Sequence, residues 1–96
     1  MSYEVVYHSE IKETDLPKIP RNIQNRIRKA IELRLLENPV MAGKPLRQSL
    51  RGHWKMRVGD YRVIYQVDQD KSLIYVLIIG NRKDVYLKAF KRFPTL

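Results

Sequence analysis

Residues 53–67 read HWKMRVGDYRVIYQV, and they alternate polar and apolar side chains on both sides of Gly59-Asp60. Such alternation is typical of a β-strand with one buried face, and a Gly-containing pair between two alternating runs is typical of a two-residue hairpin turn. The stretch therefore predicts a β-hairpin in which Val58 pairs with Tyr61 and Arg57 lies opposite Arg62.

The segments on either side of this hairpin predict the remaining elements. Residues 3–8 alternate like a strand, residues 10–16 suit a short helix, and residues 22–37 place apolar side chains at helical spacing. Residues 73–79 are apolar throughout, as expected of a central strand covered on both faces, and residues 84–93 predict a short basic helix. The predicted order is β-α-α-β-β-β-α, an α+β fold.

Length and composition indicate one small basic domain spanning residues 1–96. The 44% hydrophobic content is enough to build a core, and 19 Lys and Arg against 10 Asp and Glu give a net charge of +9. A positive potential of this kind favours polyanionic partners such as nucleic acid or an acidic protein. The alternative is a cationic surface that serves only solubility.

The sequence lacks the residues that several classes of protein function require. The chain has no cysteine, which excludes disulfides, Cys-ligated zinc and a thiol nucleophile and favours the cytoplasm. Its longest apolar run has seven residues, at 73–79, and its first eight residues do not resemble a signal peptide, so we expect no membrane association. No carboxylate pair stands at metal-ligand spacing and no Gly-rich phosphate loop is present, so we expect neither metal nor cofactor.

Cations gather on one face of the predicted hairpin. The pairing places Lys55 on the same face as Arg57 and Arg62, and like charges opposite each other destabilise a strand pair unless an anion binds between them. RNA phosphate is the anion that we expect. The alternative is that these side chains spread into solvent from the open face of a sheet.

Two residues beyond the last strand extend this cluster. Arg82 follows Gly80-Asn81, where a loop can aim its guanidinium at a ligand held over the sheet. Tyr86 could stack on a base, bind a 2′-hydroxyl or take a proton, although packing between helix and sheet is the commoner role of a tyrosine. Cleavage of RNA by its own 2′-hydroxyl needs a base, an acid and cations rather than a metal. The candidate catalytic residues are Lys55, Arg57, Arg62, Arg82 and Tyr86.

Further candidates would contact RNA around this set. His53 shares the parity of Lys55 and could act as acid or base, but a structural histidine is an equal alternative. The candidate RNA-binding residues are Arg51, His53, Lys83 and Lys88.

The pattern G-x-W-K-x-R-x-G-x-Y-R-x-x-Y at 52–65, with IIGNRKDVY at 78–86, resembles the RelE-like ribosome-dependent messenger RNA endonuclease toxins of the RelE/ParE superfamily. The resemblance covers nearly the whole chain, with weaker support from Leu50-Arg51 and from ENPVMAGKPL at 37–46. It implies a small, mainly antiparallel sheet with two N-terminal helices against one side and a short C-terminal helix. The family's active-site positions fall on the five candidate catalytic residues named above.

The resemblance also implies an activity and partners. The chain would be the toxin of a type II toxin-antitoxin system that cleaves mRNA in the A site of the ribosomal 30S subunit and thereby inhibits translation. An acidic RelB-like antitoxin would wrap around it. Some family members have a lysine, proposed as the general base, where this chain has Arg57. Arginine does not readily lose a proton, so we expect Arg57 to clamp phosphate, while Lys55, Tyr86 or a water acts as the base.

Two other functions compete with this one. A ParE-like toxin shares the fold but inhibits DNA gyrase by binding and cuts no RNA. A plain cationic RNA-binding domain ranks last, because base stacking needs exposed aromatic rings among the charges. Trp54, Tyr61 and Tyr65 have the apolar parity instead.

Overall fold

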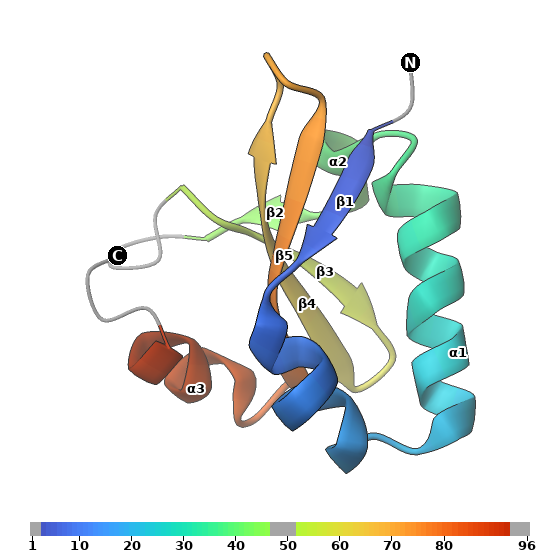
Figure 1. The fold of residues 1–96 in the computed structure, drawn as a ribbon, viewed down its shortest axis with the longest axis vertical. Coiled ribbons are helices and arrows are strands. Elements are labelled where there is room, and N and C mark those ends of the chain that lie inside the picture. Colours follow the sequence, from blue (N-terminus) through green and yellow to red (C-terminus); the bar gives the residue numbers. More distant parts are fainter. Residues whose placement is uncertain (1–2, 47–51, 93–96) are drawn as a thin grey trace.

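A computed structural model describes residues 3–46 and 52–92, and its centre is a five-stranded sheet (Figure 1). The order of the strands across the sheet is β1-β5-β4-β3-β2, with β1 parallel to β5 and the other neighbours antiparallel. The predicted α+β class with a mainly antiparallel sheet is confirmed. The strands are β1 (Glu4–Tyr7), β2 (Lys44–Pro45), β3 (Trp54–Val58), β4 (Tyr61–Asp68) and β5 (Leu73–Asn81).

The helical segments lie on both sides of this sheet. Figure 1 shows the N-terminal helices and α1 on one side and α3 on the other. The first predicted helix continues past Pro17, because a proline at the start of a new turn gives up an N–H that would have no helical partner. The segments are π-helix η1 (Ile11–Asp15), 3₁₀-helix η2 (Leu16–Lys18), α1 (Arg21–Ala30), π-helix η3 (Ile31–Leu35), α2 (Pro39–Ala42) and α3 (Val85–Arg92).

The segment expected to be a loop after Asn38-Pro39 contains two short elements, α2 and β2. The Asn38 side chain accepts a hydrogen bond from the Met41 N–H (3.3 Å) and caps α2. A Cβ at Gly43 would lie 2.4 Å from the Lys55 carbonyl oxygen and 2.2 Å from the Tyr65 hydroxyl. Only glycine lets the chain approach β3 this closely. Directly after Gly43, β2 pairs with β3.

The predicted hairpin of β3 and β4 is confirmed residue by residue. Val58 pairs with Tyr61, Arg57 with Arg62 and Lys55 with Ile64. Gly59 has a φ of +58°, which glycine adopts without strain at the first central position of such a turn. The three cations therefore share one face of the sheet.

A β-bulge in the pairing of β4 with β5 explains why Ile78 and Ile79, near the end of the apolar run, are both buried. Ile64 pairs with Ile78 but Tyr65 pairs with Val76, so Leu77 is the extra residue. The bulge changes the side to which later residues of β5 point. Val76 packs with the N-terminal helices, whereas Ile78 packs with α3.

The two sides of the sheet carry cores of different size. The larger side, here called the helix-covered face, packs under η1, α1 and η3, and its core includes Met56, Val63, Tyr65 and Val76, all fully buried. The smaller side, here called the α3 face, has buried residues Ile64, Ile78, Val85 and Ala89. Within α3, Val85 and Ala89 are buried against the sheet, whereas Leu87 and Phe90 are exposed.

A buried ion pair fastens α3 to the rest of the fold. The Arg92 guanidinium binds both carboxylate oxygens of Asp15, at 2.8 and 3.0 Å, and also donates to the bulge carbonyl of Leu77 (2.9 Å). Asp15 in turn accepts the Ile79 N–H at 3.0 Å. The pair thus provides partners for backbone groups at the bulge and fixes α3, whose first turn carries Tyr86.

Candidate functional site

The open part of the α3 face carries the predicted catalytic residues. Arg57 is exposed, and Lys55 and Arg62 are half-buried beside it. The loop after β5 contributes Arg82, and the first turn of α3 contributes Tyr86. We call these five residues the cationic patch.

Backbone contacts at the hairpin turn hold Arg62. Its Nη1 donates to the carbonyl oxygens of Gly59 (3.0 Å) and Tyr61 (2.9 Å). A guanidinium carries five N–H donors, so these two bonds orient the group without exhausting it. Arg62 is therefore placed to donate to an anion from a fixed position.

The same turn positions Arg82. The Arg82 N–H donates to the Asp60 carbonyl oxygen (2.8 Å), and its Nε lies 3.9 Å from the Asp60 carboxylate. Both side chains are largely exposed, and an exposed pair at this distance contributes about 1 kcal/mol or less. A phosphate can therefore replace Asp60 as the partner of Arg82 at little cost.

Tyr86 packs between helix and sheet and also lies beside Lys55. It packs against the small core of the α3 face, and its ring centroid lies 5.7 Å from the Lys55 ammonium nitrogen. This distance is within the range of a cation–π contact. Packing thus holds the ring at the patch, where the hydroxyl can meet a ligand of Lys55.

A cavity of about 420 Å³ opens beside the patch at the β3 edge. Its lining contains five cations and no acidic residue. Two of the cations, Arg34 of η3 and Lys44 of β2, were missed in the sequence, because they lie on elements that neither strand parity nor proximity to the hairpin connects with the site. The lining residues are Arg34, Met41, Ala42, Gly43, Lys44, Lys55, Arg57 and Arg62.

Hydrogen bonds from Arg34 close one wall of this cavity. Its Nη1 donates to the Arg57 carbonyl oxygen and its Nη2 to the Ala42 carbonyl oxygen, each at 3.3 Å. Arg34 thereby connects the end of the long N-terminal helix to both β3 and α2. Within residues 3–46 and 52–92, no carboxylate lies within ion-pair distance of Arg34, Lys44 or Arg57.

The structure does not bring all the predicted RNA-binding residues to the patch. His53 is only 2% exposed, so a ligand on the surface does not reach its ring. Lys88 lines a separate cavity of about 230 Å³ together with Asp15 and Asp84. Lys83 is exposed next to Arg82, and Arg51 lies outside the described residues.

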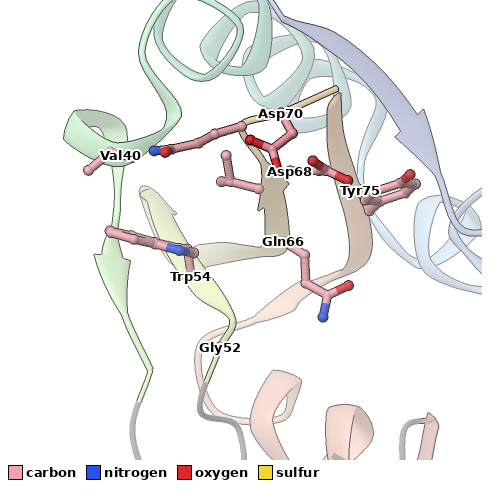
Figure 2. A pocket seen from close by; sticks show the side chains of 9 residues that line it. Val40, Gly52, Trp54, Gln66, Asp68, Asp70 and Tyr75 are labelled. Atoms are coloured by element: carbon pink, nitrogen blue, oxygen red, sulfur yellow. The ribbon is translucent and has the colours of Figure 1, made fainter. Parts of the chain in front are cut away.

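A larger cavity of about 550 Å³ lies at the other end of the sheet (Figure 2). Asp68 and Asp70 line it together with Trp54, Gln66 and Tyr75, and none of its lining residues within 3–46 and 52–92 is a lysine or arginine. Its charge is opposite to that of the cavity beside the patch. An anionic ligand is therefore expected at the cavity of about 420 Å³ beside the cationic patch.

Across residues 3–46 and 52–92, no three His, Asp or Glu side chains are grouped so that they could hold a metal ion. In the same part of the chain, no helix has the length and apolar character needed to cross a membrane.

Most of the chain matches a family of toxins from type II toxin-antitoxin systems. The family model described as the ParE toxin of the type II toxin-antitoxin system parDE matches residues 5–86. The chain belongs to this family, and its similarity to individual members makes it a RelE-like toxin.

Curated relatives agree with this assignment. The chain is 36% identical over 89 residues to Toxin RelE of Mycobacterium tuberculosis, which covers 90% of this chain and 92% of that protein. It is 30% identical over 78 residues to the mRNA interferase toxin RelE of Escherichia coli, with 78% and 81% covered.

Solved structures have the same fold. The toxin-antitoxin complex RelBE2 of Mycobacterium tuberculosis contains a chain that matches with a TM-score of 0.79 and 29% identity, over 85% of this chain and all of that one. A mutant of the E. coli toxin RelE in the free state matches with a TM-score of 0.73 and 26% identity, over 96% and 98% of the two chains.

Proposed function

We propose that this RelE-like toxin is a ribosome-dependent endoribonuclease that cuts mRNA in the ribosomal A site without a metal ion and so inhibits translation. The observation that carries the proposal is the cationic patch, in which a hairpin, a loop and a helix contribute three arginines, a lysine and a tyrosine to one surface. The name of the E. coli relative, an mRNA interferase, supports the same reaction.

The chemistry follows from the residue types in the patch. The 2′-hydroxyl of the RNA attacks the adjacent phosphorus, the bond from phosphorus to the 5′-oxygen breaks, and a 2′,3′-cyclic phosphate and a 5′-hydroxyl result. Arg57, Arg62 and Arg82 would stabilise the negative charge that accumulates on the phosphorane. Lys55 and Tyr86 would handle the two protons, one leaving the 2′-hydroxyl and one reaching the 5′-oxygen.

An antitoxin is the second proposed partner. The structural relatives from M. tuberculosis and E. coli include complexes of RelE with RelB. A RelB-like antitoxin with acidic side chains would neutralise the cationic patch, because covering these arginines without counter-charges is costly. The purified complex should therefore cleave mRNA far more slowly than the free toxin, and equal rates would contradict this arrangement.

Mapping of the cleavage ends tests the reaction. The free toxin is added to a pre-assembled ribosome complex holding a defined message, and to the same message without ribosomes. We expect cleavage only on the ribosome, with 2′,3′-cyclic phosphate or 3′-phosphate ends and 5′-hydroxyl ends. Ends bearing 3′-hydroxyl and 5′-phosphate would overturn the mechanism.

Arg82→Ala separates the nuclease from its non-nuclease alternative. Loss of one preorganised cation should lower the cleavage rate at saturating ribosome roughly 10²-fold, as for other groups that stabilise transition-state charge. Lys71→Ala, on the turn between β4 and β5 far from the patch, is the matched control and should cleave normally. A folded Arg82→Ala variant that still arrests growth without cutting mRNA would favour the ParE-like, gyrase-binding function.

A further inference from the structure

The cations beside the hairpin extend farther than one phosphate can reach. Arg82 follows β5, Arg62 lies on β4, Arg57 on β3 and Lys44 on β2, and these strands are consecutive neighbours in the sheet. Neighbouring strands are about 4.8 Å apart, so three steps cover roughly 14 Å. Charge-assisted contacts to a phosphate oxygen are only about 2.8 Å long. A phosphate held by Arg62 and Arg82 therefore leaves the far end of the row without an anion.

Arg34 and Lys44 form this far end. Both side chains are exposed and line the cavity of about 420 Å³ together with Arg57. The two bonds of 3.3 Å from Arg34 fix its guanidinium plane but use only two of its five donors. With no carboxylate within ion-pair distance among the described residues, these charges repel one another until an anion enters the cavity.

The wall of the cavity beside these cations is apolar. Met41 is 80% exposed at its rim, next to Ala42 and Gly43. A flexible thioether suits contact with a flat ring, and the cations suit a phosphate. The combination matches a nucleotide unit better than it matches an isolated carboxylate.

We infer that Arg34 and Lys44 form a second phosphate subsite, which binds the phosphodiester next to the scissile one on the same single-stranded RNA. This inference rests on the proposed function, in which the cationic patch holds the scissile phosphate. Arg34 and Lys44 then act as positioning residues: they fix the register of the strand across the hairpin and do not touch the reacting atoms.

Binding of uncleavable RNA tests the subsite without the reaction. The probes are 2′-O-methyl RNA oligonucleotides with one phosphodiester or with five, labelled for fluorescence anisotropy and titrated with the free toxin at several salt concentrations. Lys44→Gln should weaken binding of the longer probe roughly three- to tenfold and lower its salt slope by about 0.7, the value expected for one phosphate contact on a single strand. Binding of the short probe should change little.

Matched variants exclude a general effect of charge or stability. Lys71→Gln removes the same charge at the opposite end of the sheet and should leave the salt slope of the longer probe unchanged. Lys44→Arg keeps the charge and should restore binding. Arg34→Gln should weaken the longer probe as Lys44→Gln does, but it also removes the bonds to Arg57 and Ala42, so its thermal unfolding is measured alongside.

Each outcome is decisive for one of the two proposals. If Lys44→Gln behaves like Lys71→Gln, or if the wild type shows no salt-dependent binding, the subsite does not exist, even if the toxin cuts mRNA on the ribosome. If Lys44→Gln impairs only the complex with the antitoxin, the cavity is an antitoxin contact instead. If the wild type cuts no message but Lys44→Gln still weakens RNA binding as described, the nuclease proposal fails and the subsite stands.

Discussion

The two faces of the sheet use the same strands for opposite purposes. On the helix-covered face, Met56, Val63 and Val76 are fully buried under the N-terminal helices. On the α3 face, Val85 and Ala89 pack against Ile64 and Ile78, and the hairpin places Lys55, Arg57 and Arg62 on the same side. Since successive residues of a strand point to opposite faces, one hairpin supplies both the core and the site. A short helix on one side thus leaves room for a ligand without weakening the other side.

Removal of the buried Asp15–Arg92 ion pair, which connects α3 to the helix-covered face, should lower the stability of the fold more than any other change. Asp15→Asn leaves the Arg92 guanidinium, whose side chain is 11% exposed, without its counter-charge. We expect the free energy of unfolding to fall by about 3–5 kcal/mol, as for other buried pairs that lose one partner. Chemical denaturation measures this change. Asp60→Asn, which removes an exposed pair, is the control and should cost less than about 1 kcal/mol.

Gly43→Ala should disturb the edge where the helix-covered face meets the cavity. The added Cβ would lie 2.4 Å from the Lys55 carbonyl oxygen, so β2 must move away from β3. We expect a loss of about 1–3 kcal/mol in the free energy of unfolding, typical of overpacking. In the double variant with Tyr65→Phe the clash with the carbonyl remains. Full recovery of stability there would show that only the hydroxyl group was in conflict.

Tyr65→Phe probes the helix-covered face through its pH dependence. The buried Tyr65 hydroxyl donates to the Pro39 carbonyl oxygen (2.7 Å), and its loss should cost about 1–2 kcal/mol near neutral pH. Burial raises the pKa of Tyr65 to about 12, with Arg34 opposing the shift.

The direction of this pKa shift sets the pH range of the effect. The folded state keeps the Tyr65 proton where an unfolded chain would lose it, so this contribution to stability is complete below about pH 10 and is lost as the pH rises toward 12. Tyr65→Phe should therefore lose less stability over that range than the wild type. In a titration followed by tyrosinate absorbance, the variant should lack a late-ionising tyrosine, and an unchanged curve would contradict the assignment.

The smallest expected effect on stability is on the α3 face. Arg57→Ala removes one of two like charges that lie directly opposite each other, so the free energy of unfolding should stay unchanged or rise by up to about 1 kcal/mol. Lys29→Ala, exposed on α1, is the control for loss of charge alone. A marked destabilisation by Arg57→Ala would show that its side chain supports the fold rather than a ligand.

Parity along the hairpin predicts which of its cations share one face of the sheet. The pairing of Arg57 with Arg62 follows from a two-residue turn, because the turn length fixes which residues face each other. The same alternation predicts the apolar parity of Tyr65, which is fully buried on the opposite face. The bulge at Leu77 could not be predicted, because it arises from how β4 and β5 pair and has no local sequence signal.

Other parts of the site depend on contacts between distant segments. Arg34 and Lys44 reach the cavity only because η3 and β2 pack at the β3 edge, and the Asp15–Arg92 pair joins residues 77 positions apart. His53 has the parity of Lys55, but packing buries it, and parity reports the side to which a residue points rather than what covers it.

Local sequence patterns are enough to specify the α+β class, the hairpin register and the gathering of Lys55, Arg57 and Arg62 on one face, because alternation and turn length are local properties of the chain. The surroundings of that face arise only in the folded chain: the bulge that turns Ile78 toward α3, the ion pair that fixes α3, and the cavity that adds Arg34 and Lys44. These features depend on packing between segments far apart in the chain, whose relative positions no local pattern encodes.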